Sequence, residues 1–138
     1  MPVKTVLFVC VHNAGRSQMA EAFLNRMARE GSLPVQAVSA GVEAGASINP
    51  VVREVMAELG YMMEGQAPKM LTPEIAAGAY RIITMGCGVD ASSCPARILV
   101  SEDWGLADPA GQPLEAVRLV RDEILRRVGC LLEDLARP

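Results

Sequence analysis

Aromatic side chains are scarce in this sequence and make up 4% of its 138 residues. Binding by base stacking or by an aromatic-lined groove is therefore not expected. The net charge is −3 and there is no basic block, which argues against a nucleic-acid or anionic-membrane surface. No apolar run approaches the length that spans a bilayer, and residues 3–11 reach polar residues at once without a signal-peptide cleavage site. We therefore expect a cytoplasmic protein that binds neither nucleic acid nor membrane.

Histidine occurs once and cysteine four times. In a chain without an export signal these thiols are expected to be reduced at rest, so that any disulfide is transient and catalytic. The length predicts one domain over residues 1–138, and an apolar fraction of 51% is enough for a core.

Apolar runs and helical periodicities alternate along the chain. They predict strands at residues 3–9, 35–39, 80–85 and 97–100, and helices at about 17–30, 50–59, 73–78 and 113–136. Asn49-Pro50 and Thr72-Pro73 each supply an N-cap followed by a first-turn proline. Such alternation predicts an α/β fold with right-handed βαβ crossovers and helices on both faces of a parallel sheet. Ligands of these sheets bind beyond the carboxyl ends of the strands, where Cys10 and Cys87 are expected.

Cys10 and Arg16 enclose a loop between the first strand and the first helix, formed by Val11, His12, Asn13, Ala14 and Gly15. The loop N–H groups and the helix N-terminus can converge on a tetrahedral anion, and the Arg16 guanidinium can bind two of its oxygens. The same positive field favours a Cys10 thiolate, the predicted nucleophile. The alternative is a strand-end cysteine with a surface arginine, which the strand–loop–helix context disfavours.

Three residues of this loop, and Ser17 just after it, could support its function. Ser17 can donate its hydroxyl to the Cys10 thiolate or cap the helix, and both roles can hold together. Asn13 can adopt left-handed backbone angles, and Gly15 lets the backbone approach the anion closely. His12 could tune Cys10 or could be an ordinary solvated loop residue.

Cys87 and Cys94 are separated by six residues. A zinc pair would be more closely spaced and would need two further ligands, which the sequence does not obviously supply. A redox pair fits better, although a helical segment between them would hold the Cα atoms about 10 Å apart and would have to unwind before a disulfide formed. The other interpretation is two incidental loop cysteines.

Asp108 precedes Pro109 in a loop that is expected at the same rim of the sheet. Its carboxyl group could protonate an oxygen that leaves the anion, or it could simply start a turn. Asp103 is the second candidate for the acid. Cys130 is expected on the outer face of the last helix, as an exposed thiol without a redox role.

Several short motifs are distributed over nearly the whole chain: Val6-Leu7-Phe8-Val9-Cys10, Asn13, Arg16-Ser17-Gln18-Met19-Ala20-Glu21, Ser39-Ala40-Gly41, Thr84-Met85-Gly86-Cys87, Cys94-Pro95, Asp103-Trp104-Gly105 and Asp108-Pro109-Ala110-Gly111. With these motifs the chain resembles the low-molecular-weight protein tyrosine phosphatase superfamily, and within it the arsenate reductases of the thioredoxin-coupled type. The resemblance implies a three-layer α/β/α fold with a four-stranded parallel sheet in the order 2-1-3-4.

The resemblance also implies a mechanism. Cys10 attacks arsenate held by the loop amides and Arg16, while Asp108 protonates the departing hydroxyl. Cys87 then attacks Cys10 and arsenite leaves, after which Cys94 attacks Cys87 to give a Cys87–Cys94 disulfide. Thioredoxin or another thiol reductant reduces that disulfide. Phosphate or sulfate would compete with arsenate for the oxyanion cradle, the site formed by the loop N–H groups and Arg16.

The chain departs from its relatives at two positions. Relatives often carry a second loop cysteine where this chain has Gly15, but the thiol relay does not need it. Some relatives bind potassium near the loop, and here Asn13, Glu21 and Ser39 match that site while Lys69 replaces its acidic member. Because an ammonium group could substitute for the ion, we expect no bound metal, and we expect no cofactor.

Two other functions compete with reduction. One is a phosphatase that uses the same Cys10, Arg16 and Asp108. The tyrosine phosphatases carry aromatics after the Asp-Pro pair, where this chain has Ala110-Gly111-Gln112, so reduction is favoured and weak hydrolysis of small phosphate esters is still expected. The other is a non-catalytic regulator that binds an oxyanion or senses thiols, against which the intact catalytic residues argue.

Overall fold

A four-stranded parallel sheet forms the centre of the computed structural model, which describes residues 2–85 and 102–136. The strand order is β2-β1-β3-β4, as predicted. The elements along the chain are β1 (Lys4–Cys10), α1 (Arg16–Glu30), β2 (Val35–Gly41), α2 (Pro50–Ala57), α3 (Pro73–Ala77), β3 (Arg81–Thr84), β4 (Glu102–Asp103) and α4 (Leu114–Ala136).

The fourth strand corrects one sequence prediction. The strand predicted at residues 97–100 lies outside the described residues. The sequence predicted no strand between residues 101 and 112, but Glu102 and Asp103 pair in parallel with Ile83 and Thr84 of β3. A strand of two exposed acidic residues shows neither alternation nor an apolar run, so the sequence carries no signal for it.

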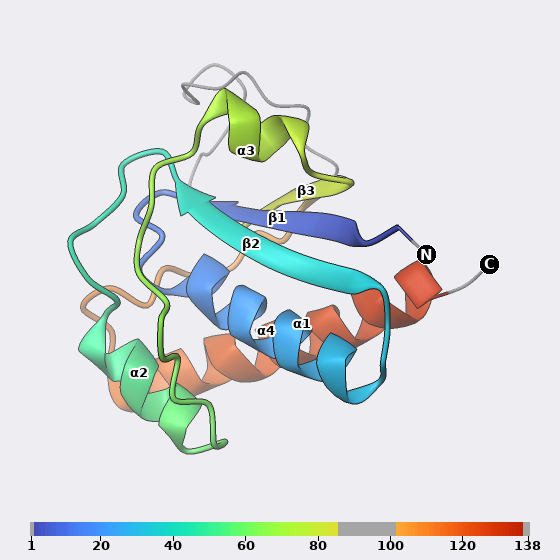
Figure 1. The fold of residues 1–138 in the computed structure, drawn as a ribbon. Coiled ribbons are helices and arrows are strands. Elements are labelled where there is room, and N and C mark those ends of the chain that lie inside the picture. The colour runs from blue at the N-terminus through green and yellow to red at the C-terminus, as the bar shows by residue number, and fades with distance from the viewer. Residues whose placement is uncertain (1, 86–101, 137–138) are drawn as a thin grey trace.

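The helices cover both faces of the sheet, as Figure 1 shows, with α1 and α4 beneath it and the short α3 above it. Strand β1 serves both cores because alternate side chains of a strand point to opposite faces. Val6 and Phe8 belong to the larger core, which α1 and α4 complete. Leu7 and Val9 belong to a smaller core that includes Ile75 of α3. The strand that leads to Cys10 is thus buried on both faces.

Capping residues and an ion pair fix the helices that border the loop after β1. Asn49 caps α2 by accepting a hydrogen bond from the backbone N–H of Val51, which confirms the predicted start of this helix. At the other end, Glu58 binds Arg118 and Arg121 of α4, and these hydrogen bonds lower the pKa of Glu58 to about 2. Helix α2 is therefore anchored to α4 with its N-terminus toward the loop.

No helix in residues 2–85 and 102–136 combines the length and the apolar composition that a membrane span needs.

Candidate active site

The loop after β1 turns its carbonyl groups outward. The carbonyls of Val11, His12 and Ala14 accept hydrogen bonds from the backbone N–H groups of residues 43, 45 and 49, at 2.8, 2.8 and 2.9 Å. Asn13 has a φ of 52°, the left-handed conformation expected for it, and its N–H points to the Cys10 sulfur at 3.2 Å. With the carbonyls bound outside, the N–H groups of the loop are directed toward Cys10, as an oxyanion cradle requires.

Cys10 is buried, and its sulfur lies 2.8 Å from the Ser17 hydroxyl. Ser17 Oγ accepts a hydrogen bond from the Asn13 side-chain amide at 2.7 Å, which leaves the hydroxyl proton available to the sulfur. A thiolate can only accept hydrogen bonds, so the Ser17 hydroxyl and the Asn13 N–H provide the donors that a nucleophilic sulfur needs. Helix α1 begins at Arg16 with Gly15 at its N-cap and no side-chain cap. Ser17 therefore serves the thiol and does not cap the helix.

Two glutamines that the sequence analysis did not select fix the orientation of Asn13. Gln18 is fully buried and donates through Nε2 to the backbone and side-chain oxygens of Asn13, each at 3.0 Å. Gln66 in turn donates to the Gln18 side-chain oxygen at 2.8 Å, and the backbone N–H of Lys69 donates to Asn13 Oδ1 at 2.9 Å. Because Asn13 Oδ1 accepts two hydrogen bonds, its NH₂ group must face Ser17.

Arg16 is 3% exposed and is held by two segments on the rim of the sheet. Its Nη1 donates to the carbonyls of Met85, just after β3, and Leu106, at 3.0 and 2.9 Å. Its Nη2 lies 3.9 Å from Asp108 Oδ2. Backbone carbonyls thus orient the guanidinium beside Cys10 before any anion arrives, as preorganised electrostatic stabilisation requires.

The two candidate acids have different surroundings. Asp108 borders the cavity over Cys10, its side chain is 43% exposed, and its Oδ1 accepts the backbone N–H of Ala110 at 3.0 Å. It therefore starts a turn and also reaches the rim. Asp103 is bound by the Thr84 hydroxyl at 2.6 Å and by the Gly105 N–H at 3.2 Å. The geometry favours Asp108 as the acid.

The cavity over Cys10 is small, about 40 Å³, and its described lining residues are Cys10, His12, Ala14, Gly15, Arg16, Asn49, Asp108, Pro109 and Ala110. A volume of this size holds roughly three water molecules, which suits a tetrahedral oxyanion. The sequence analysis did not assign Asn49, Pro109 or Ala110 to the site. His12 is exposed, and its Nδ1 donates to the Glu43 carbonyl at 3.1 Å, so this hydrogen bond turns the ring toward Glu43 and does not involve Cys10.

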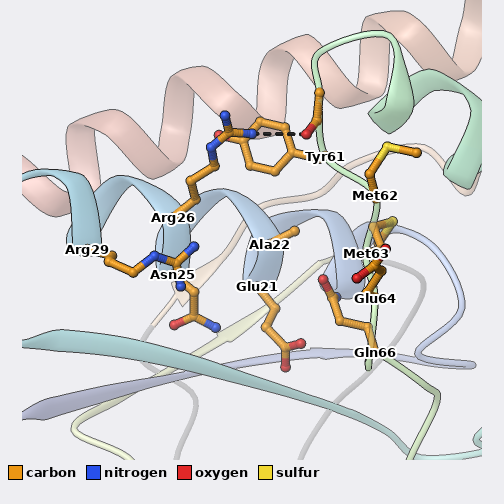
Figure 2. A pocket seen from close by; sticks show the side chains of 11 residues that line it. Glu21, Ala22, Asn25, Arg26, Arg29, Tyr61, Met62, Met63, Glu64 and Gln66 are labelled. Carbon is orange, nitrogen blue, oxygen red and sulfur yellow. Dashed lines mark hydrogen bonds between the residues drawn. The ribbon is translucent and has the colours of Figure 1, made fainter.

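A larger cavity of about 490 Å³ lies beside α1, away from the thiol. Figure 2 shows Arg26 of this helix against the Tyr61 ring, with its guanidinium donating to the Gly60 carbonyl. Glu21 and Gln66 also line it, and both connect to residues around the loop. The chemistry of the small cavity, with its thiol, guanidinium and carboxyl group, makes that one the candidate active site.

Lys69 lies beside two of the residues that match a potassium site, because its ammonium faces Glu21 and its backbone N–H donates to Asn13. Glu21 Oε1 accepts the Ser39 hydroxyl at 3.1 Å and lies 3.6 Å from the Lys69 ammonium. The Glu21 side chain is 11% exposed, so the ammonium supplies a positive charge to a mostly buried carboxylate. Among the residues that the structure describes, no group of three or more His, Cys, Asp and Glu could hold a metal ion.

Two of the three expected relay thiols, Cys87 and Cys94, lie outside the described residues. Cys10 is a free, buried thiol, and Cys130 is a free thiol exposed on α4, as predicted.

Comparisons with known proteins cover nearly the whole chain. The chain is 32% identical over 136 residues to the glutaredoxin arsenate reductase of Synechocystis sp., a match of 97% of this chain and 100% of that one. It is similar to the solved structure of an arsenate reductase in the phosphate binding state, with 34% identity, a TM-score of 0.81 and coverage of 96% of this chain and 98% of that one. It is also similar to a thioredoxin-dependent arsenate reductase from Corynebacterium glutamicum, with 34% identity, a TM-score of 0.73 and coverage of 96% of this chain and 62% of that one. The model of one family, low molecular weight phosphotyrosine protein phosphatase, matches residues 5–138, and the chain belongs to this family.

Proposed function

We propose that this chain is an arsenate reductase. The observation that carries the proposal is the buried Cys10 thiol in a cavity of about 40 Å³ between Arg16 and Asp108. A thiol in such a cradle can attack a tetrahedral oxyanion, and relatives at 32–34% identity bear the name arsenate reductase. The second support is the pair Cys87 and Cys94, since a phosphatase has no use for two further thiols.

The proposed reaction transfers two electrons from thiols to arsenic. The Cys10 thiolate attacks As(V) while Asp108 protonates a hydroxyl that leaves as water. Cys87 attacks the Cys10 sulfur, the S–As bond breaks with its electron pair on arsenic, and arsenite leaves a Cys10–Cys87 disulfide. Cys94 then attacks Cys87 and releases the Cys10 thiolate. An external dithiol protein reduces the Cys87–Cys94 disulfide, so the proposal requires a reducing compartment, the cytoplasm.

Phosphate-ester hydrolysis is the second candidate function, because phosphate and arsenate have the same shape and charge. None of the described residues that line the cavity is Phe, Tyr or Trp, and Ala110 follows the Asp-Pro pair at the rim. The site therefore offers little to hold an aryl leaving group. We propose hydrolysis of small phosphate esters as a weak side activity.

The test is a coupled assay that follows NADPH consumption with arsenate, in parallel with thioredoxin and its reductase and with glutaredoxin, glutathione and its reductase. We expect arsenate-dependent oxidation of NADPH with one of the two systems, and inhibition by phosphate or sulfate. Oxidation with neither system, together with efficient hydrolysis of phosphate esters, would overturn the proposal in favour of a phosphatase. Neither activity would indicate a non-catalytic oxyanion-binding or thiol-sensing protein.

We also propose that the Lys69 ammonium makes a monovalent cation unnecessary. Replacing potassium by a bulky organic cation at constant ionic strength is then expected to leave the initial rate unchanged. The Lys69→Ala variant should instead gain rate and thermal stability as KCl is added, because Glu21 would lose its positive partner. Lys4→Ala, a change of the other lysine at the opposite end of β1 from Cys10, is the control. Potassium dependence of the unaltered chain would contradict this proposal.

A further inference from the structure

We propose that Pro109 is a positioning residue that anchors Asp108 over the oxyanion cradle, and that in this chain its ring packs against Gly15 in the space that a side chain would take. Pro109 is buried although its neighbours Asp108 and Ala110 are not. A buried ring in an otherwise exposed loop needs a site to receive it, and here that site is the backbone of the cradle itself.

The space around Gly15 identifies this contact. A Cβ atom on Gly15 would lie 2.8 Å from Pro109 Cγ and 3.6 Å from Pro109 Cδ. The next neighbour is Val52 Cγ2 of the buried face of α2, at 3.5 Å. The φ angle of Gly15 is −144°, so a left-handed backbone does not explain the glycine. A proline ring has few ways to move aside, so a side chain at position 15 would displace Pro109.

The remaining tethers of Asp108 are weak or local. Its side chain is 43% exposed, its distance to the Arg16 guanidinium is 3.9 Å, and its hydrogen bond to Ala110 stays within the turn. An ion pair of this exposure and length contributes little to position. Upstream, Leu106 is held through its carbonyl by Arg16. Pro109 is therefore the buried anchor on the downstream side, one residue from the carboxyl group.

The inference rests on the proposed role of Asp108 as the acid. A displaced Asp108 slows only a step that needs its proton, whereas the loop N–H groups, Arg16 and the thiol stay in place. Esters with poor leaving groups depend on the acid far more than esters with good ones. Loss of the Pro109 anchor should therefore slow esters with poor leaving groups selectively, whereas general damage to the fold would slow all esters alike.

The experiment compares hydrolysis of phenyl phosphate, a poor leaving group, with that of 2,4-dinitrophenyl phosphate, a good one. For Gly15→Ala and Pro109→Ala we expect kcat/KM on phenyl phosphate to fall by about tenfold or more, a part of the usual contribution of a general acid, with little change for the dinitrophenyl ester. We compare kcat/KM because it reports phosphoryl transfer to Cys10, before the hydrolysis of the Cys10 phosphoryl group that both esters share. Asp108→Asn should show the same selectivity more strongly. Pro113→Ala, which changes an exposed proline just before α4, is the matched control.

The double variant Gly15→Ala/Pro109→Ala tests whether the two single variants lose activity through the same contact, between residue 15 and the Pro109 ring, or through two independent effects. Since the change at residue 109 removes the ring atom that a Cβ at residue 15 meets, the double variant should lose no more than Pro109→Ala alone. Additive losses, or equal losses on both esters, would overturn the proposal, and Pro109→Ala answers the question if Gly15→Ala does not fold. If Asp108→Asn shows no selectivity, the acid role fails and the inference with it. Selectivity in Asp108→Asn alone would reject only the positioning role of Pro109.

Discussion

Replacing Cys87 or Cys94 by serine is expected to abolish multiple-turnover reduction of arsenate and to leave hydrolysis of small phosphate esters unchanged. The two reactions share Cys10, Arg16 and Asp108, but only reduction has to pass electrons from sulfur to arsenic. A serine hydroxyl cannot form the mixed disulfides through which thiol exchange proceeds. The coupled NADPH assay and a chromogenic phosphate ester measure the two reactions on the same preparation.

The two substitutions stop the relay at different points. The Cys94→Ser variant should release a single arsenite per chain and then hold a Cys10–Cys87 disulfide, whereas Cys87→Ser should release none. Mass spectrometry of peptides under acid quench distinguishes these states. Cys130→Ser, a change of the exposed thiol on α4, is the matched control and should turn over normally. Turnover of arsenate at the unaltered rate by either relay variant would exclude the relay.

The part of the site that the sequence predicts is the part that is contiguous in the chain. Strand β1, the loop and α1 follow one another within residues 4–30, and their order alone places Cys10 at the carboxyl end of a buried strand. The left-handed Asn13 and the bond from Ser17 to Cys10 follow from the same short range of residues. Caps such as Asn49 are predictable for the same reason, because a helix start is a local event.

The residues that the sequence analysis missed act across long separations. Gln18 and Gln66 meet 48 residues apart, and Pro109 reaches Gly15 from the far end of the chain. Nothing in the spacing of these residues signals the contacts, because the sheet topology brings the segments together. Strand β4 was missed for a different reason, since two residues that pair with β3 leave no periodicity. Gly41 lies between these two cases. The sequence analysis included it in the motif Ser39-Ala40-Gly41, but only the three-dimensional structure explains why this position is a glycine.

Gly41 ends β2 opposite Cys10, and its α-carbon faces the backbone of the cradle. A Cβ there would lie 2.7 Å from the Val11 carbonyl oxygen and 2.9 Å from the Asn13 nitrogen. Both atoms belong to the backbone, so no side chain can rotate away. Gly41 itself is fixed, because its N–H and its carbonyl are bonded at 2.9 Å to residues 69 and 71. A methyl group at residue 41 must therefore displace the loop backbone at Val11 and Asn13.

The Gly41→Ala variant is accordingly expected to fold with a distorted cradle. Affinity for phosphate, measured by calorimetry, and kcat for phosphate esters should both fall, the latter by about 100-fold or more, since removal of one oxyanion donor costs this much in other enzymes. Thermal unfolding measured alongside separates this loss from a loss of the folded state.

Gly45→Ala is the matched control for this prediction. Gly45 lies against the same loop, but a Cβ on it would come no closer than 3.7 Å to its nearest neighbour, the His12 carbonyl oxygen, which is ordinary van der Waals contact. This variant should bind phosphate and hydrolyse esters as the unaltered chain does. Equal activity of the two variants would mean that the loop adapts to a methyl group at residue 41. In that case Arg16 and the N-terminus of α1 would fix the geometry of the oxyanion site, and the packing of β2 against the loop would contribute less.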